Sequence, residues 1–224
     1  VKRRRFLSEG RPVLCISQLK ELQQIYRCAD SLCIGTACTI AELLSNPLLP
    51  QYIKEPLAQI GSPAIRNVAT IGGNLCNASP AADALPMLYA LDAVLCLASE
   101  GGEETVPVQD FILAPGVTRL GKGQLLLEIR IPIERDWQCL YRKIGMRRAN
   151  SLSKISFYAI ADHLAGRTRD VRIAFGAVAP TVARCREAEQ EILSGMQLPG
   201  SAWLRPIIAH YDSLLQPIDD ARSS

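Results

Sequence analysis

The chain has 224 residues with a formal net charge of +3, and 48% of its residues are apolar. This length and composition predict a globular protein with one large hydrophobic core or two smaller ones. The small excess of positive charge disfavours a nucleic-acid binder, which usually concentrates far more Lys and Arg on one surface. The short basic run at residues 2–5 is therefore expected to be a solvated segment.

The eight cysteines are spread along the chain, and most of them have apolar neighbours in the sequence. A chain of this length does not depend on disulfides, so we expect reduced and buried thiols. Cys28, Cys33 and Cys38 recur every five residues. They form no CxxC pair and no fourth ligand is obvious, which disfavours a metal or iron–sulfur site.

No stretch of the sequence has the character of a membrane span. The longest apolar stretch, residues 81–98, is interrupted by Asp83, Pro86 and Asp92. A span needs about 20 residues with few charges. The opening residues also lack the pattern of a signal peptide, so the expected location is the cytoplasm.

The first part of the chain is predicted to alternate short strands with short helices. Thr39 and Glu42 have the spacing of a capping box, which marks a helix start. A second helix, loosened by Pro50 and Pro56, is expected over residues 48–60. The expected strands are residues 13–16 and 32–35, a hairpin of residues 94–97 and 105–108, and residues 125–131, in which Leu125, Leu127, Ile129 and Ile131 alternate before Pro132.

The second part is predicted to form one sheet that helices cover. Strands are expected at residues 141–146, 154–164 and 171–178, although the second could be partly helical. Helices are expected at residues 184–193 and 202–215. With a boundary near residue 135, the pattern predicts an α+β protein of two units, residues 1–134 and 135–224.

Residues 70–74 hold the first half of a pattern that can carry chemistry. Gly72 and Gly73 have no side chains, so a ligand can come close to their backbone amides. Several amides aimed at one point form an anion-binding nest, and Thr70 and Asn74 add polar side chains. The alternative is that the glycine pair forms an ordinary tight turn.

Residues 79–83 hold the second half of this pattern. Ser79 and Pro80 are typical of a helix start, and the helix is expected to run to about Leu91. Asp83 would then lie in the first turn, where a carboxylate can bind ribose hydroxyls or simply complement the helix dipole. Together the two halves suit a dinucleotide, although the pattern is neither GxGxxG nor a Walker motif with its lysine.

The run Ile-Gly-Ser-Pro-Ala-Ile-Arg-Asn-Val-Ala-Thr-Ile-Gly-Gly-Asn at residues 60–74 resembles the flavoprotein subunits of the xanthine dehydrogenase and carbon monoxide dehydrogenase family. The likeness continues through Ala-Ser-Pro-Ala-Ala-Asp at residues 78–83. It covers nearly the whole chain, and its central motif is long and specific. The other matching segments are residues 90–93, 106–107, 110–111, 126–129, 131–132, 141–143 and 172–181.

This resemblance implies an FAD-binding domain of the vanillyl-alcohol-oxidase type, followed by a small α+β domain. It implies that a loop binds the pyrophosphate of FAD and that the residues of this loop are Thr70, Ile71, Gly72, Gly73 and Asn74. No cysteine-rich insertion follows this loop, so the family variants with an additional iron–sulfur cluster are not favoured.

Four further positions are implied by the resemblance. Ser79 and Asp83 match residues that serve the phosphates and the adenosine ribose. Leu126 matches a backbone contact to the adenine, and Lys143 falls where the family often has a basic residue near the flavin. The alternative for Leu126 is an ordinary strand residue, and for Lys143 an exposed charge on a hairpin.

The sequence also departs from the family. Members carry an earlier glycine-rich loop, Ala-Gly-Gly-Thr-Asp, on the other side of the pyrophosphate, and this sequence begins just past the expected position of that loop. Its last residues, 219–224, look short of the family's closing segment. We therefore expect either part of a longer chain or a truncated homologue, whose FAD site would be half built.

The resemblance implies an oxidoreductase subunit that transfers electrons. Substrate is hydroxylated on a molybdopterin partner subunit, and electrons pass through a [2Fe–2S] partner subunit to FAD and on to NAD or another acceptor. The flavin carries this chemistry, so we assign no general acid, base or nucleophile. His163 and His210 are expected to have structural roles.

Two other functions remain open at this point. The chain could be a structural or assembly subunit that has lost FAD, which the missing first loop motivates. It could also be a flavin oxidase that works alone, but the match of the second unit argues against this alternative.

Overall fold

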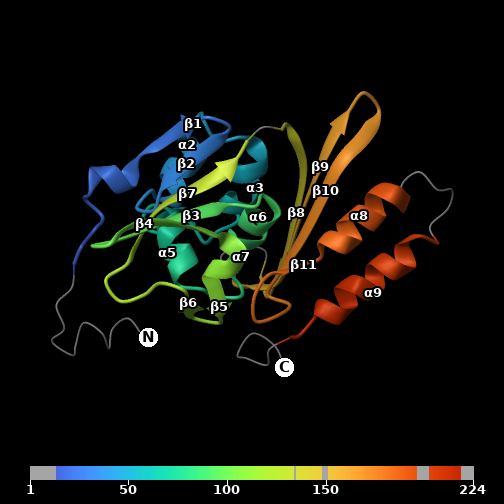
Figure 1. Cartoon of the computed structure of the whole chain (residues 1–224). Coiled ribbons are helices and arrows are strands. Elements are labelled where there is room, and N and C mark those ends of the chain that lie inside the picture. Colours follow the sequence, from blue (N-terminus) through green and yellow to red (C-terminus); the bar gives the residue numbers. More distant parts are fainter. Residues whose placement is uncertain (1–13, 134, 148–150, 196–201, 218–224) are drawn as a thin grey trace.

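The computed structural model describes residues 14–133, 135–147, 151–195 and 202–217. Two large antiparallel sheets, of five and four strands, flank a central group of helices, and a third sheet has only two short strands. Two C-terminal helices cover the outer face of the four-stranded sheet (Figure 1). The expected α+β class is confirmed. The basic run at residues 2–5 and the closing residues 219–224 lie outside the described residues.

The first sheet has the strand order β1-β2-β7-β3-β4. Its strands are β1 (Ile25–Cys28), β2 (Ser31–Gly35), β3 (Val94–Ser99), β4 (Gly102–Pro107) and β7 (Leu125–Pro132). Every neighbouring pair is antiparallel, and β3 and β4 form the expected hairpin. Apolar side chains such as Ile34, Leu95 and Ile129 enter the main core and are almost fully buried.

Two strand predictions for this sheet were wrong in detail. Residues 14–16 form no strand and Leu14 is 86% exposed, because none of the described strands pairs with this segment; Val13 lies outside the described residues. Along β7 Ile129 and Ile131 are buried as expected, but at the start of the strand the buried residue is Leu126 rather than Leu125 or Leu127. The register of β7 with β3 shifts between Cys96 and Leu97. A shift of one residue changes which side chains of the strand point into the core.

Short helices fill the space between the two sheets. The capping box of Thr39 and Glu42 is confirmed, because each side chain binds the other residue's amide at the start of α2 (Ile40–Ser45). Helix α3 (Gln51–Ala58) begins after Pro50 and retains Pro56, as expected. The remaining short elements are η1 (Lys20–Gln23), α4 (Pro63–Arg66), α5 (Ile71–Cys76), α6 (Leu85–Ala90), α7 (Val108–Phe111), β5 (Ile112–Ala114) and β6 (Val117–Thr118).

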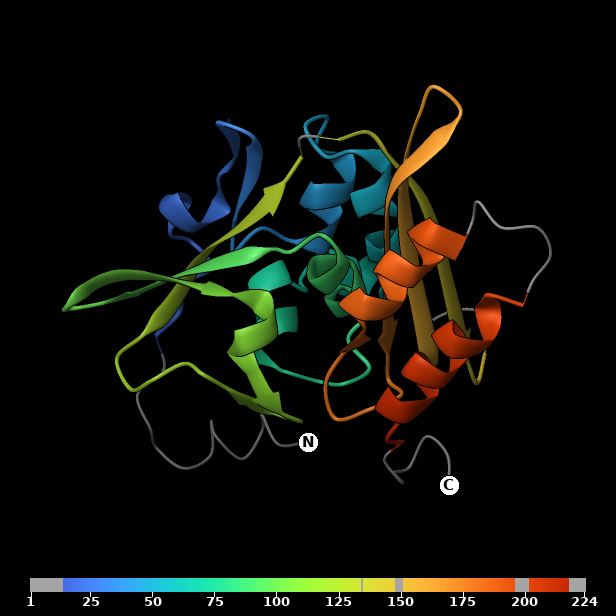
Figure 2. The same cartoon turned by 45° about the vertical axis from the view of Figure 1, so that its right-hand side comes forward.

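The second sheet has the order β11-β10-β9-β8, again antiparallel. Its strands are β8 (Trp137–Gly145), β9 (Ser153–Leu164), β10 (Arg167–Gly176) and β11 (Ala183–Arg184). The middle segment, for which a partly helical form was considered, is a strand over its full length. Helices α8 (Arg186–Gly195) and α9 (Leu204–Leu214) cover the outer face, as expected (Figure 2).

Helix α6 joins the two sheets into one core. All six of its residues are buried, and it packs against β9 and β10 of the second sheet. The main apolar cluster therefore includes Ile34 and Leu95 of the first sheet together with Tyr158 of the second. A smaller cluster around Ile192 and Tyr211 lies between the second sheet and the two C-terminal helices.

The cysteines differ in part from the prediction of buried thiols. All eight are free, but Cys15, Cys28 and Cys76 are exposed, because apolar neighbours in sequence do not guarantee a buried position in space. Within the described residues, no cluster of three or more His, Cys, Asp or Glu side chains could hold a metal ion. No described helix combines the length and apolar character that crossing a bilayer requires.

Candidate cofactor groove

The glycine-containing segment forms the start of a short helix. Thr70 is the N-cap of α5, and its hydroxyl accepts a hydrogen bond from the Gly73 amide at 3.0 Å. The Ile71 and Gly72 amides donate to the carbonyls of Cys38 and Thr36, at 3.1 and 3.0 Å. The Asn74 amide donates to the Thr70 carbonyl. All four amides have hydrogen-bond partners within the protein, so the prediction that they form an open anion-binding nest is wrong.

The two glycines have a steric explanation instead. A Cβ at Gly72 would lie 2.4 Å from the Thr36 Cβ and 2.7 Å from its carbonyl oxygen. A Cβ at Gly73 would lie 2.9 Å from the Thr70 hydroxyl that caps the helix. Gly72 therefore lets α5 pack directly against Thr36 at the end of β2, and Gly73 leaves room for the capping hydroxyl of Thr70.

One of those side chains has an unsatisfied polar atom. The Asn74 side-chain oxygen is buried and has no hydrogen-bond partner among the described residues. Asn74 lines two neighbouring cavities, one of about 300 Å³ with Thr70 and Gly73 in its wall, the other of about 320 Å³ with Ser79 and Asp83. A buried acceptor without a partner marks a place where a bound group can supply the missing donor.

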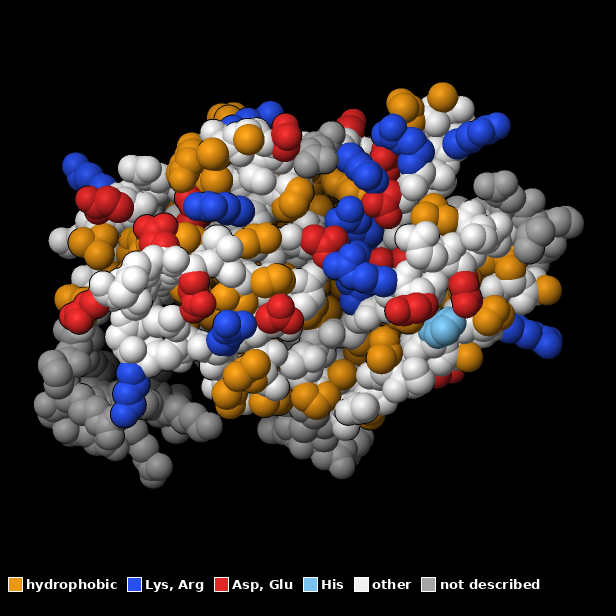
Figure 3. Space-filling model, in the orientation of Figure 1, with side chains coloured by type: hydrophobic (Ala, Val, Ile, Leu, Met, Phe, Trp, Pro, Cys, Tyr) orange, Lys and Arg blue, Asp and Glu red, His pale blue; other side chains and the backbone are white. Residues whose placement is uncertain are grey.

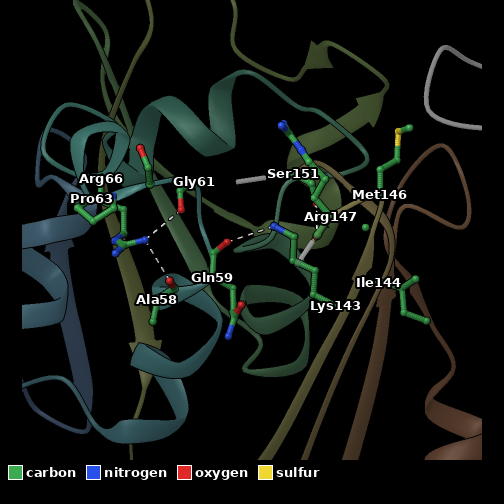
Figure 4. A pocket seen from close by; sticks show the side chains of 12 residues that line it. Ala58, Gln59, Gly61, Pro63, Arg66, Lys143, Ile144, Met146, Arg147 and Ser151 are labelled. Atoms are coloured by element: carbon green, nitrogen blue, oxygen red, sulfur yellow. Dashed lines mark hydrogen bonds between the residues drawn. The ribbon is translucent and has the colours of Figure 1, made fainter. Parts of the chain in front are cut away.

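A third and larger cavity continues from these two. It has a volume of about 700 Å³ and shares Gly61 and Ser151 with the Asp83 cavity. Its lining includes Arg66, Lys143 and Arg147, as Figure 4 shows for the side chains around it. Because consecutive cavities share wall residues, we treat them as one elongated feature, the cofactor groove, which runs from Thr70 to Arg147.

The segment before α6 differs from the prediction. Ser79 and Pro80 do not begin a helix; residues 79–84 form turns, and α6 starts at Leu85. Ala78 has a positive φ of 45°, and the Pro80 carbonyl accepts a hydrogen bond from the Ala177 amide of the second part of the chain. That long-range contact holds the segment in an extended turn, so Asp83 lies before the helix rather than in its first turn.

Asp83 is buried and bound by three donors. Its Oδ1 accepts from the Ser153 hydroxyl at 2.5 Å and from the Tyr141 hydroxyl at 3.1 Å, and its Oδ2 pairs with the Lys143 ammonium at 2.6 Å. Burial, and then the negative charge of Asp83, raise the pKa of Tyr141, so its hydroxyl stays protonated and donates. Asp83 thus connects the first part of the chain to β8 and β9.

Lys143 is not the exposed hairpin charge that was the alternative. Its side chain is 11% exposed, and its ammonium also donates to the carbonyl of Gln59 at 3.2 Å (Figure 4). Arg66 acts in a comparable way on the adjoining wall, where one guanidinium nitrogen donates to the carbonyls of Ala58, Ile60 and Gly61. These bonds satisfy carbonyls at and just after the end of α3.

Leu126 lies in the first sheet and does not line the groove cavities. Its carbonyl accepts a hydrogen bond from the Thr36 hydroxyl at 2.8 Å. Thr36 also accepts from the Gly72 amide through its own carbonyl, so it connects β7 to α5. Ile71 and Gly72 are buried behind the groove and likewise support it without lining it.

The structure therefore brings together part of the predicted set of residues. Thr70, Gly73, Asn74, Ser79, Asp83 and Lys143 line the groove. Sequence reasoning missed Thr36, Tyr141 and Ser153. Tyr141 lies two residues before Lys143 in a segment that matches the family, which was a usable signal. No local pattern distinguishes Thr36 or Ser153, because their roles depend on residues far away in the chain.

Residues 2–134 match the family model described as the FAD binding domain in molybdopterin dehydrogenase, and residues 141–224 match the CO dehydrogenase flavoprotein C-terminal domain. The chain belongs to the FAD-binding subunit family of the molybdenum hydroxylases. Membership makes it an oxidoreductase subunit with an FAD-binding domain, which confirms the resemblance seen in the sequence.

Relatives of this flavoprotein family extend the match along the chain. The glyceraldehyde dehydrogenase medium chain of Sulfolobus acidocaldarius is 31% identical over 218 residues, which cover 95% of this chain and 75% of the relative. A putative xanthine dehydrogenase FAD-binding subunit of Escherichia coli is 34% identical over 186 residues, covering 80% of this chain and 64% of the relative. The chain therefore spans about two thirds to three quarters of the length of these relatives.

A solved structure shows the same fold. Carbon monoxide dehydrogenase from Hydrogenophaga pseudoflava, in a form that lacks the Mo-pyranopterin moiety, superposes with a TM-score of 0.83. The match covers 92% of this chain and 72% of that chain, at 24% sequence identity. The expected architecture of an FAD-binding domain with a small C-terminal domain is therefore confirmed.

Proposed function

We propose that the cofactor groove binds FAD and that the subunit relays electrons from a [2Fe–2S] partner subunit, through FAD, to NAD or another acceptor. The observation that carries the proposal is the side-chain oxygen of Asn74, a residue that lines the groove: this oxygen is buried and has no partner among the described residues. FAD has hydroxyl and N–H donors that can satisfy such an acceptor.

The shape and chemistry of the groove also suit FAD. Three adjoining cavities give the elongated space that a dinucleotide needs. One end has the hydroxyl and amide side chains of Thr70 and Asn74, and the other has the basic side chains of Lys143 and Arg147. A mixture of hydroxyl, amide and cationic groups can bind phosphates and sugar hydroxyls in one molecule.

In this proposal the residues predicted from the family motif have two kinds of role, contact with FAD and support of the groove wall. Thr70, Gly73, Asn74, Ser79, Asp83 and Lys143 form the wall that meets FAD. Ile71, Gly72 and Leu126 support that wall through Thr36 and Cys38. When bound, FAD supplies the electron-transfer chemistry, and the side chains of this subunit bind, orient and enclose it.

We further propose partner subunits with molybdopterin and [2Fe–2S] clusters, because medium chains such as that of glyceraldehyde dehydrogenase are named as parts of larger enzymes. The division at about residue 135 is proposed from the gap between the two sheets, which lies between Pro132 and Trp137. A cytoplasmic location is proposed because all eight cysteines are free.

A flavin absorption spectrum of the full-length protein, followed by titration of the FAD-depleted protein with FAD, tests the proposal. We expect flavin bands in the purified protein and saturable uptake after depletion. Replacement of Asn74 by Leu should weaken FAD binding about 10-fold, since a hydrogen bond to a buried acceptor is lost. Full-length protein that is colourless and takes up no FAD would contradict the proposal.

One observation favours the alternative of an assembly subunit without FAD. The four amides of residues 71–74, which the sequence suggested for the pyrophosphate, are all engaged within the protein. The same titration separates the two functions. An assembly subunit would associate with the partner subunits and leave added FAD free in solution.

A further inference from the structure

We infer that Tyr141 and Ser153 are positioning residues of the FAD site, which fix Asp83 so that Asp83 holds the Lys143 ammonium at the groove wall. The inference rests on the proposed function. Neither residue lines the larger cavity itself, and both come from the second sheet, whereas the glycine segment belongs to the first part of the chain. The FAD site would thus depend on hydroxyl groups that act from behind the cavity wall.

The geometry of the Asp83 carboxylate supports this role. Its Oδ1 receives both hydroxyl groups, at 2.5 Å from Ser153 and 3.1 Å from Tyr141, which leaves Oδ2 for the Lys143 ammonium at 2.6 Å. A carboxylate that is bound through both oxygens cannot rotate without losing bonds to buried donors. The two hydroxyls therefore determine where Oδ2, and with it the ammonium, is held.

The burial of these groups makes the arrangement rigid. Ser153 is fully buried and Tyr141 is 4% exposed, while Asp83 is 7% exposed. Water cannot easily replace a hydroxyl in such a position, so each lost donor leaves a carboxylate lone pair unsatisfied. The raised pKa of Tyr141, caused mainly by burial, keeps its proton in place.

The Lys143 ammonium has one donor left for a ligand. An ammonium carries three N–H donors. Hydrogen bonds between described residues use two of them, to Asp83 and to the Gln59 carbonyl, and Lys143 lines the cavity of about 700 Å³ (Figure 4). The third N–H is therefore available to an acceptor oxygen of FAD, either a phosphate oxygen or a carbonyl of the isoalloxazine ring.

A lysine needs such support because its side chain is flexible. Its four-carbon stem loses considerable conformational entropy when the ammonium is held in one place. Here the side chain of Lys143 has lost this conformational entropy before the ligand binds, because Asp83 and Gln59 already hold its nitrogen in position. Preorganisation of this kind raises affinity by lowering the cost of binding.

The test is the affinity of the FAD-depleted full-length protein for FAD, measured for Tyr141→Phe and Ser153→Ala. Each variant should bind FAD about 10-fold more weakly, because a hydrogen bond to a charged group is lost. Matched controls remove equally buried hydroxyls elsewhere. Ser156→Ala removes a hydroxyl on the same strand as Ser153 that has no partner among the described residues. Tyr211→Phe removes a tyrosine hydroxyl of α9 that donates to the Ile173 carbonyl. Both controls should bind FAD as the wild type does.

A double-mutant cycle separates positioning from a general loss of stability. Lys143→Met should also weaken FAD binding, and adding Tyr141→Phe to it should have little further effect, because Tyr141 acts through Lys143. Competition by ADP and by riboflavin identifies which half of FAD accepts the hydrogen bond from Lys143. If the variants lose affinity for one of these fragments, the inference is supported and the contact lies on that half of FAD. Full additivity in the cycle, or unchanged affinity of Tyr141→Phe and Ser153→Ala, would overturn it.

These outcomes are distinct from a failure of the proposed function. If the wild-type protein binds no FAD, the proposed function itself is wrong, and the positioning role falls with it. If the wild type binds FAD and Asn74→Leu weakens it while Tyr141→Phe and Ser153→Ala do not, only the positioning role is wrong. Melting temperatures measured without FAD ensure that each comparison is made on folded protein.

Discussion

Asp83 and Asp92 lie two residues beyond opposite ends of the buried helix α6, and each binds basic side chains of the second part of the chain. Asp83 pairs with Lys143 on β8, whereas Asp92 pairs with Arg172 on β10 and Arg184 on β11. Figure 3 shows basic and acidic side chains gathered along this boundary between the two sheets. Helix α6 is therefore attached to the second sheet at both of its ends.

The ion pairs of Asp92, at the C-terminal end of α6, should contribute more to stability than to cofactor binding. Arg172, Arg184 and Arg186 all contact its carboxylate, and the Arg184 side chain is only 6% exposed. Asp92→Asn preserves the shape and tolerates the φ of 52°, but it removes one counter-charge from the buried Arg184 and from the half-buried Arg172. We expect a loss of about 2–3 kcal/mol in the free energy of unfolding, less than for a fully buried pair because Asp92 is partly exposed.

Urea unfolding measures this loss, and Asp110→Asn, at an exposed aspartate, is the matched control. The control should change stability by less than about 0.5 kcal/mol. Equal midpoints for Asp92→Asn and wild type would show that the arginines find other partners.

Gly72→Ala should destabilise the fold at the back of the groove. The new Cβ would meet the backbone and Cβ of Thr36, which cannot move without disturbing β2. We expect a loss of about 1–3 kcal/mol, the usual cost of overpacking. Gly101→Ala is a matched control, since the nearest atom to its new Cβ is 3.6 Å away. Thermal unfolding of the two variants compares them directly, and equal melting temperatures would contradict the steric role of Gly72.

Stability should fall between pH 10 and 12. Burial raises the pKa of Tyr52 and Tyr89 to about 12, whereas an unfolded tyrosine titrates near pH 10. The folded state then holds protons that the unfolded state has lost, so the free energy of unfolding decreases as pH rises through this window and is unaffected below it.

Tyr89→Phe provides the check on this pH dependence. The Tyr89 hydroxyl is buried without a partner among the described residues, so its removal should be neutral or slightly stabilising at pH 7. At pH 11 the variant should retain about 1 kcal/mol that the wild type loses. Urea titrations at the two pH values measure the difference. Equal losses of unfolding free energy in both proteins would rule out Tyr89 as a cause of the pH dependence.

Cys15 should react first with an alkylating reagent. Its thiol is exposed, and hydrogen bonds from Ser17 lower its pKa. Cys76 is also an exposed residue, but burial around its thiol raises the pKa to about 11. Since the thiolate is the reactive species, Cys76 should react more slowly. Mass spectrometry of partially alkylated native protein ranks the sites; modification of buried Cys33 before Cys15 would contradict the order.

Local signals account for what could be predicted of the fold. The capping box of Thr39 and Glu42, the glycine-linked hairpin of β3 and β4, and the strand segments of the second sheet all depend on residues within a few positions of one another. Hydrogen bonds and side-chain periodicity at that range are properties of the segment itself. The same holds for the glycine-containing motif, whose order of residues was enough to indicate the flavoprotein family.

Tertiary structure alone decided how the groove is built. The amides of residues 71–74 donate to the carbonyls of residues 36 and 38 and to the carbonyl and hydroxyl of Thr70. Asp83 is bound by Tyr141, Lys143 and Ser153, between 58 and 70 residues away. Such partners are chosen by packing of α5 and α6 against the two sheets. The amino-acid sequence by itself determined which chemical groups are present at the groove, and the fold determined which of them are already satisfied and which remain free for a cofactor.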